Sequence, residues 1–274
     1  RAVGMSADRL TTVDRVVRWF CSGKQGYIAD QLPNCGVLFL RVNFQPKQGE
    51  SPAGRDDHAT DEVDPMKVMA RGGNVLRLCD DVGQREAQRC AGVEHCTFVK
   101  SIGDVLLFVS GLARAREPDP IASSSLPGSP ATGGCYGKSD DSPAEHLVSL
   151  SRFATAVAER ADECFGDSSA SVTVAGLHCG PVSGGVIGDD RLMYDVFGDT
   201  VNTASRVMST SGSAGVWMSS AMRTTLVGPD HETGAHTTDD VHLPQYGLIL
   251  QALVPREMKG KGTVYICRVR PLAP

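Results

Sequence analysis

The sequence predicts an α+β domain built on an antiparallel sheet with helices on one face. Three observations lead to this fold class. Apolar residues alternate in some stretches, as in half-buried strands, and recur at helical spacing in others. Segments rich in Gly, Pro and Asp separate these stretches as turns and loops. The stretches follow one another as strand, helix, hairpin, helix and strand, and this βαββαβ order favours an antiparallel sheet covered by its helices.

The first strand, the first helix and the hairpin are predicted in the first half of the chain. Residues 36–44, GVLFLRVNF, have an apolar strand pattern. Residues 65–91 carry apolar side chains at helical spacing, which predicts a helix although two glycines weaken its middle. Residues 96–109 have the pattern of two strands joined by a turn at Gly103-Asp104.

The second half supplies an insertion, the second helix and the remaining strands. Residues 114–146 are rich in Ser, Pro, Gly and Asp without any period, which predicts a disordered surface insertion near residues 115–145. A helix is predicted over residues 147–165. We expect the strand that begins near residue 172 to end at Gly180-Pro181. Strands are predicted at 172–180, 185–187, 192–197, near 216, at 248–254 and at 264–269.

These elements set the expected domain boundaries. Residues 1–35 are predicted to be an N-terminal linker with a short amphipathic helix at 10–20, residues 36–270 the main domain, and residues 271–274 a tail. The chain begins with Arg1 rather than Met, so we expect it to be a piece of a longer protein.

Composition narrows the class of protein. At 274 residues, with 41% hydrophobic and 22% charged residues, the chain has an ordinary globular composition. Its net charge of −5 argues against a nucleic-acid partner. The nine cysteines are odd in number and form no C-x-x-C pair, which favours reduced thiols over a disulfide or a zinc site. No apolar run approaches the roughly 20 residues of a membrane span and no signal peptide is present, so we expect a cytoplasmic domain whose parent could still be a membrane protein.

A helix predicted after residue 198 carries a polar pair on one face. Asp199 and Thr200 are favourable N-cap residues for it. Asn202 and Arg206 are four residues apart and therefore project from the same face. An amide beside a guanidinium suits a ribose or phosphate oxygen, although an exposed polar pair on a surface helix is the alternative for these two residues alone.

Residues 176–206, GLHCGPVSGGVIGDDRLMYDVFGDTVNTASR, decide between these readings. The string GLHCGPV at 176–182 and the string FGDTVNTASR at 197–206 match the fingerprints G-[IL]-H-x-G-P-V and [FW]-G-x-T-V-N-x-A-S-R. The chain thus resembles the class III nucleotide cyclases, the adenylyl and guanylyl cyclases. The resemblance extends over about 36–268, without the insertion, and implies a ferredoxin-like core.

The resemblance implies purine contacts at two positions. Lys100 lies in K-S-I-G-D, which is similar to the family's K-T-I-G-D, where the lysine hydrogen-bonds the purine and the aspartate is a metal carboxylate. Asp195 falls where adenylyl members place the carboxylate that accepts from the adenine amino group. Guanylyl members usually have glutamate and cysteine at these two positions, so Lys100 with Asp195 favours ATP over GTP.

The same resemblance implies contacts to the ribose and the phosphates. Asn202 matches the asparagine that orients the ribose, and Arg206 matches the arginine that stabilises charge on the α-phosphate. The string MKGKG at 258–262 is similar to the family's K-G-K-G loop, in which a lysine contacts the distal phosphates. We assign this role to Lys261, with Lys259 as a close alternative.

One position departs from the family. Where the family has the aspartate of F-A-D-I-x-G-F as its first metal carboxylate, this chain has Arg41 in F-L-R-V-N-F. Two-metal phosphoryl chemistry needs carboxylates that bridge both ions, and an arginine would repel Mg²⁺. Asp104 is therefore a doubtful metal residue that could equally be a turn residue.

In this family, active sites form between two domains arranged head to tail. One domain supplies the metal carboxylates and the other the purine, ribose and transition-state contacts. The sequence therefore predicts the second half of a tandem or heterodimeric adenylyl cyclase that makes cyclic AMP and pyrophosphate from ATP. Mg²⁺ or Mn²⁺ ions would be held mainly by the partner domain, which lies in the same parent chain or in another one. The alternatives are a guanylyl cyclase half and a non-catalytic regulatory pseudocyclase.

Overall fold

The computed structural model describes residues 29–42, 65–89, 96–112, 145–161, 172–187, 193–228 and 239–272. The helix predicted at 10–20 and the insertion predicted near 115–145 lie outside these residues. Among the described helices, none is both long and apolar enough to cross a membrane.

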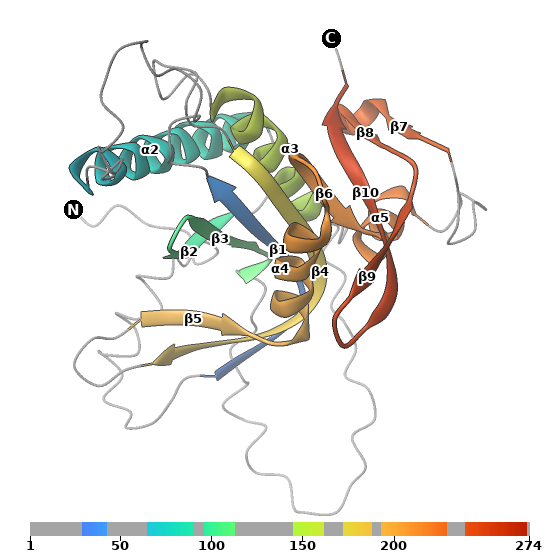
Figure 1. The fold of residues 1–274 in the computed structure, drawn as a ribbon, viewed down its shortest axis with the longest axis horizontal. Coiled ribbons are helices and arrows are strands. Elements are labelled where there is room, and N and C mark those ends of the chain that lie inside the picture. Colours follow the sequence, from blue (N-terminus) through green and yellow to red (C-terminus); the bar gives the residue numbers. More distant parts are fainter. Residues whose placement is uncertain are drawn as a thin grey trace, which may run out of the picture.

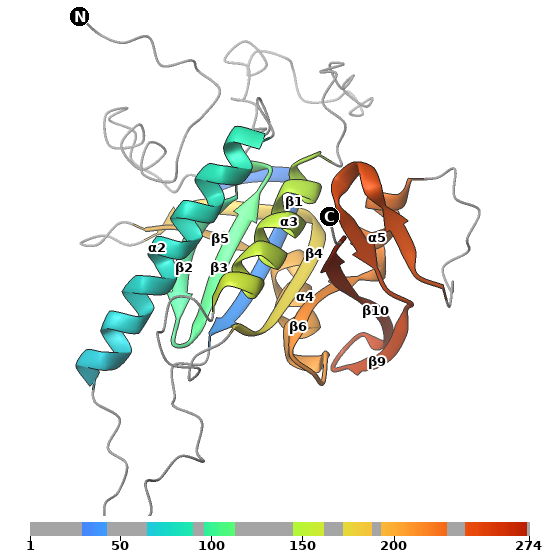
Figure 2. The ribbon, with the colours of Figure 1, turned by 90° about the horizontal axis from the view of Figure 1, so that it is seen from above.

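The described residues form one twisted sheet with helices on both of its faces (Figures 1 and 2). The helices are α2 (Pro65–Arg89), α3 (Glu145–Arg160), α4 (Asp199–Thr210) and α5 (Ser220–Val227), with a short 3₁₀ turn η4 (Pro244–Tyr246). The strands are β1 (Ala29–Val42), β2 (Thr97–Ile102), β3 (Val105–Ser110), β4 (Val172–Ile187), β5 (Met193–Phe197), β6 (Gly215–Ser219), β7 (Val241–Leu243), β8 (Leu248–Leu250), β9 (Val254–Met258) and β10 (Gly262–Pro271).

The predicted α+β class and βαββαβ order are confirmed. The first elements run β1, α2, β2, β3, α3, β4, and the strands lie in the order β2-β3-β1-β4-β6-β10-β8-β7, with β5 paired to β4 and β9 to β10. The strand pairs are antiparallel except for the parallel pair of β4 and β6. The hairpin of β2 and β3 turns at Gly103-Asp104, as predicted.

Side chains of β1 alternate between two hydrophobic clusters. Leu38 and Leu40 join the cluster that contains α2, α3 and α5, whereas Val37 and Phe39 join the cluster that contains α4. The two helices of the βαββαβ core thus lie on one face, as predicted, and α4, which follows that core in the chain, covers the other (Figure 2).

Close packing of α4 on β4 depends on Gly176. A Cβ atom built at this glycine would lie 2.4 Å from the backbone nitrogen of Met208 and 2.5 Å from the carbonyl oxygen of Ala204. Any side chain would therefore displace the helix. The glycine at the start of the GLHCGPV string thus sets the distance between α4 and the sheet.

The prediction that a strand ends at Gly180-Pro181 is wrong, because β4 runs without interruption through both residues. Proline has no backbone N–H and is tolerated in a sheet only where no ladder hydrogen bond is required. The pairing of β4 with β1 has such a position, because its register shifts between the pairs Cys35–Gly180 and Leu32–Val182. Pro181 lies at this irregularity.

The predicted capping of α4 is also wrong. The N-cap is Gly198, which has no side chain to accept a hydrogen bond. The two expected capping side chains have other partners: the Thr200 hydroxyl donates to the carbonyl of Pro181 at 2.6 Å, and the Asp199 carboxylate accepts from Lys261. Tertiary contacts thus use the polar groups that would otherwise cap the helix.

Candidate functional site

Lys100 and Asp195, predicted to read the purine, are in direct contact. Lys100 Nζ on β2 donates to Asp195 Oδ2 on β5 at 2.5 Å. The Asp195 side chain is 5% exposed, and its other oxygen accepts from the backbone N–H of Val196 at 2.8 Å. A buried carboxylate needs such partners, and together they fix its orientation. The structure therefore presents one donor and one acceptor side by side at this edge of the sheet.

Large apolar side chains flank this ion pair on the hairpin of β4 and β5. Ile187, Met193 and Phe197 are 37%, 47% and 46% exposed. Because Asp195 alternates with Tyr194 and Val196, which are buried against the α4 cluster, it shares a strand face with Met193 and Phe197. This exposed apolar surface on the β4–β5 hairpin is of the kind that another protein covers.

Arg206 and Asn202 lie four residues apart on α4, as predicted. Arg206 Nη1 donates to the carbonyl of Lys259 at 2.7 Å, which ties the helix to the turn between β9 and β10. This bond uses one of the five N–H donors of the guanidinium. Lys259 therefore contacts α4 through its backbone carbonyl. Lys261 contacts the start of the same helix through its ammonium.

The start of α4 holds a second charged contact. Lys261 Nζ donates to Asp199 Oδ2 at 2.6 Å. The hydrogen bond from Lys261 is the main reason that the pKa of Asp199 lies below its usual value. Asp199 was expected only as a helix cap, and no pattern in the sequence relates residue 199 to residue 261. Their pairing follows from the fold, which brings the β9–β10 turn over α4.

His178 lies on β4 near these charges and hydrogen-bonds Ser219 Oγ through Nδ1 at 2.7 Å. Burial lowers the pKa of His178 to about 4, helped by the nearby ammonium of Lys261 and opposed by Asp199. The imidazole is therefore neutral at neutral pH. The Ser219 hydroxyl also accepts from the backbone N–H of Met222 and so caps α5. These contacts indicate a structural role for His178.

This shift predicts a pH dependence of stability. Below pH 6.5 the histidine of the unfolded chain takes up a proton that the folded His178 refuses until about pH 4. The free energy of unfolding should therefore fall by up to roughly 3 kcal/mol between pH 6.5 and pH 4. Urea denaturation at several pH values measures it. His178→Gln should flatten this slope whereas the matched replacement of the exposed His242 should not, and equal slopes in all three proteins would contradict the assignment.

The expected position of the first metal carboxylate holds a guanidinium. Arg41 Nε, at the end of β1, lies 3.5 Å from Asp104 Oδ2, in the turn between β2 and β3. The backbone N–H of Val42 donates to the Asp104 carbonyl at 2.9 Å and keeps the two segments together. Within the described segments, no three His, Cys, Asp or Glu side chains gather as a metal site. A carboxylate paired with arginine does not fit a two-metal centre.

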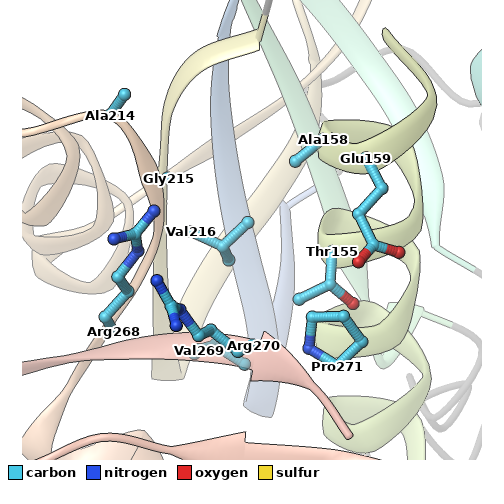
Figure 3. Close-up of a pocket in the computed structure, with 10 residues that line it drawn as sticks. All are labelled: Thr155, Ala158, Glu159, Ala214, Gly215, Val216, Arg268, Val269, Arg270 and Pro271. Carbon is cyan, nitrogen blue, oxygen red and sulfur yellow. The ribbon is translucent and has the colours of Figure 1, made fainter. Parts of the chain in front are cut away.

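A separate cleft of about 520 Å³ lies between α3, β6 and β10 (Figure 3). Arg268 and Glu159 are among its lining residues. None of the predicted site residues lines it. The Lys100–Asp195 pair and the contacts between α4 and the β9–β10 turn therefore lie outside this cleft.

Comparisons with known proteins find adenylate and guanylate cyclases. The model of the protein family "Adenylate and Guanylate cyclase catalytic domain" matches residues 72–265 of the chain. Adenylate cyclase type 9 of Xenopus laevis is 41% identical over 73 residues, which are 26% of this chain and 5% of that protein. Guanylate cyclase soluble subunit beta-2 of Rattus norvegicus is 62% identical over 34 residues, 12% of this chain and 5% of that protein. The matches therefore span only a small part of these relatives.

Solved structures show the same fold. The catalytic core of a rhodopsin-guanylyl cyclase with converted specificity, in complex with ATPalphaS, has a TM-score of 0.54 and 21% identity, covering 89% of this chain and 98% of that one. The guanylyl cyclase Cya2 has a TM-score of 0.52 and 16% identity, covering 89% of this chain and 95% of that one.

Proposed function

Because the chain belongs to the family of adenylate and guanylate cyclase catalytic domains, we propose that it is one half of an adenylyl cyclase site shared with a second cyclase domain. The shared site would convert ATP to cyclic AMP and pyrophosphate. The observation that carries this proposal is the contact of Arg41 with Asp104, at 3.5 Å, in a chain that otherwise has the residues expected to bind the nucleotide. A chain that keeps the nucleotide contacts and fills the metal position with a cation needs carboxylates from elsewhere.

The reaction is an intramolecular displacement on ATP. The 3′-hydroxyl oxygen attacks the α-phosphorus, the bond from that phosphorus to the bridging oxygen of the β-phosphate breaks, and pyrophosphate leaves with the electron pair. The hydroxyl proton passes to a base or to water outside this chain's residues. Two-metal phosphoryl chemistry uses Mg²⁺ or Mn²⁺, and we propose that the partner domain holds these ions.

The residues of this chain would bind and orient the nucleotide. Lys100 donates to the adenine ring and Asp195 accepts from its amino group. Asn202 orients the ribose, and Arg206 stabilises the charge that develops on the α-phosphate. Lys261, whose ammonium lies at the start of α4, binds the distal phosphates. The arrangement along α4 supports these roles, since Arg206 and Asp199, which accepts from Lys261, lie on either side of Asn202 in the helix.

The apolar surface on the β4–β5 hairpin supports a partner domain. Met193 and Phe197 are exposed on the same strand face as Asp195, next to the purine contacts. A second cyclase domain seated there would cover these side chains and complete the site from the other side. Its location in the same parent protein or another chain, and the cytoplasmic location of the site, belong to this proposal.

The proposal is tested by the activity of the chain alone and in a mixture. The isolated chain should turn over ATP barely above background, and a domain with both metal aspartates should raise the rate by about a hundredfold or more, because metal ions contribute several kcal/mol to such reactions. Initial rates of cyclic AMP formation with Mg²⁺ or Mn²⁺ measure this. Robust turnover by the chain alone would refute the half-site, and an inactive mixture that still contains the heterodimer would favour the pseudocyclase.

A further inference from the structure

The contact between Asp199 and Lys261 is placed where the phosphates of the proposed substrate would bind. The carboxylate of Asp199 is 76% exposed, whereas the Lys261 side chain is 25% exposed. The lysine is thus held against the protein by a group that itself faces solvent. Its ammonium lies at the start of α4.

The backbone of the β9–β10 turn is fixed independently of this ion pair. The N–H of Lys261 donates to the Met258 carbonyl at 2.9 Å, and Gly260 and Gly262 take left-handed conformations, with φ of +76° and +69°. Arg206 binds the carbonyl of Lys259 at the same turn. Loss of the Asp199 carboxylate would therefore free the side chain of Lys261 and leave the turn in place.

The two residues of α4 that contact this turn, Asp199 and Arg206, lie on one face of the helix. Asp199, Asn202 and Arg206 follow a spacing of three and four residues, so they project from the same face. A helix rises 1.5 Å per residue, which separates Asp199 from Arg206 by about 10 Å along the axis. Asn202, which is proposed to orient the ribose, lies between them. A nucleotide on this face would bring its phosphates to the lysine and thus to Asp199.

We propose that Asp199 is a positioning residue that holds Lys261 until phosphate oxygens of the nucleotide replace its carboxylate. This inference rests on the proposed function of the site. A carboxylate and a phosphate cannot both occupy the best acceptor position at one ammonium, and a nearby carboxylate also repels a phosphate. An exposed ion pair is weak, so a multiply charged phosphate group can displace it. Asp199 therefore orders Lys261 before binding and opposes tight retention of pyrophosphate afterwards.

The test measures pyrophosphate binding to the whole chain by isothermal calorimetry. Asp199→Asn should tighten binding about fivefold, because the competing carboxylate is gone while Lys261 remains. Asp80→Asn, which removes an exposed carboxylate on α2, should leave the affinity unchanged. In a Lys261→Ala background the gain from Asp199→Asn should disappear, since Asp199 acts through the lysine. Asp199→Glu should keep the wild-type affinity.

Steady-state kinetics of the active heterodimer add a second readout. Asp199→Asn should lower the KM for ATP and the inhibition constant of pyrophosphate by similar factors, with kcat unchanged or lower. Equal pyrophosphate affinities of the wild type and Asp199→Asn would overturn the inference, as would an undiminished gain in the Lys261→Ala background. An inactive heterodimer together with the predicted pattern in calorimetry would overturn the proposed function and leave the role of Asp199 intact.

Discussion

Replacing Arg206 with alanine should lower kcat of the heterodimer by about a hundredfold to a thousandfold and change the KM for ATP little. The proposed role of Arg206 is to neutralise charge that appears on the α-phosphate only in the transition state, and the loss of such a group lowers kcat by this amount. The hydrogen bond of Nη1 to the Lys259 carbonyl, at 2.7 Å, holds the guanidinium in place before the substrate binds. This preorganisation is what makes the expected effect large.

Initial rates over a range of ATP concentrations separate kcat from KM. Arg77→Ala is the matched control, because it removes an exposed arginine from α2, outside the proposed site. An unchanged kcat in Arg206→Ala, in a heterodimer that is otherwise active, would remove the catalytic assignment and favour the pseudocyclase.

The second large effect concerns the choice of purine. Replacing Lys100 with glutamate and Asp195 with cysteine should shift the ratio of kcat/KM for ATP over GTP by about tenfold to several hundredfold toward GTP. Each mismatch leaves a buried polar group without a partner, at roughly 1–3 kcal/mol apiece. The two changes have to be made together. Lys100 Nζ lies 2.5 Å from a buried carboxylate, so Lys100→Glu alone would place two carboxylates in contact.

The measurement compares initial rates with both nucleotides in wild type and double variant, with thermal unfolding to confirm that the variant folds. An unchanged ratio would show that these side chains do not contact the base. A preference of the wild type for GTP would establish the guanylyl alternative.

Local patterns predicted the core well and failed where distant segments decide the structure. The periodicity of residues 65–91 predicted α2 despite Gly72 and Gly73. The prediction was correct because the periodic side chains Val75, Leu78 and Val82 pack into the core and stabilise the helix. The strand end at Gly180-Pro181 was wrong, since a bulge in the pairing with β1 accommodates the proline. That bulge has no local signal in the sequence.

The site shows the same division. The position of Asn202 and Arg206 on one face of a helix followed from their spacing. The contact of Lys100 with Asp195 joins residues 95 positions apart, so only the family resemblance could indicate that the two act together. The contact of Asp199 with Lys261 was not anticipated at all. Contacts between side chains that are far apart in the sequence produce no periodic pattern from which they could be predicted.

The uninterrupted course of β4 also sets the dimensions of the site. Pro181 accepts a hydrogen bond from Thr200 in the first turn of α4, and Gly185, four residues further along the strand, pairs with Asp195 on β5. A strand rises about 3.3 Å per residue, so this stretch of backbone places the carboxylate proposed to contact the base about 13 Å along the strand from the point where α4, proposed to contact the ribose and phosphates, is attached. In the proposed site, this strand would fix the distance between the contacts to the base and the contacts to the phosphates. A nucleotide analogue with the same base but a longer or shorter link between base and phosphate would then make only one of these two sets of contacts.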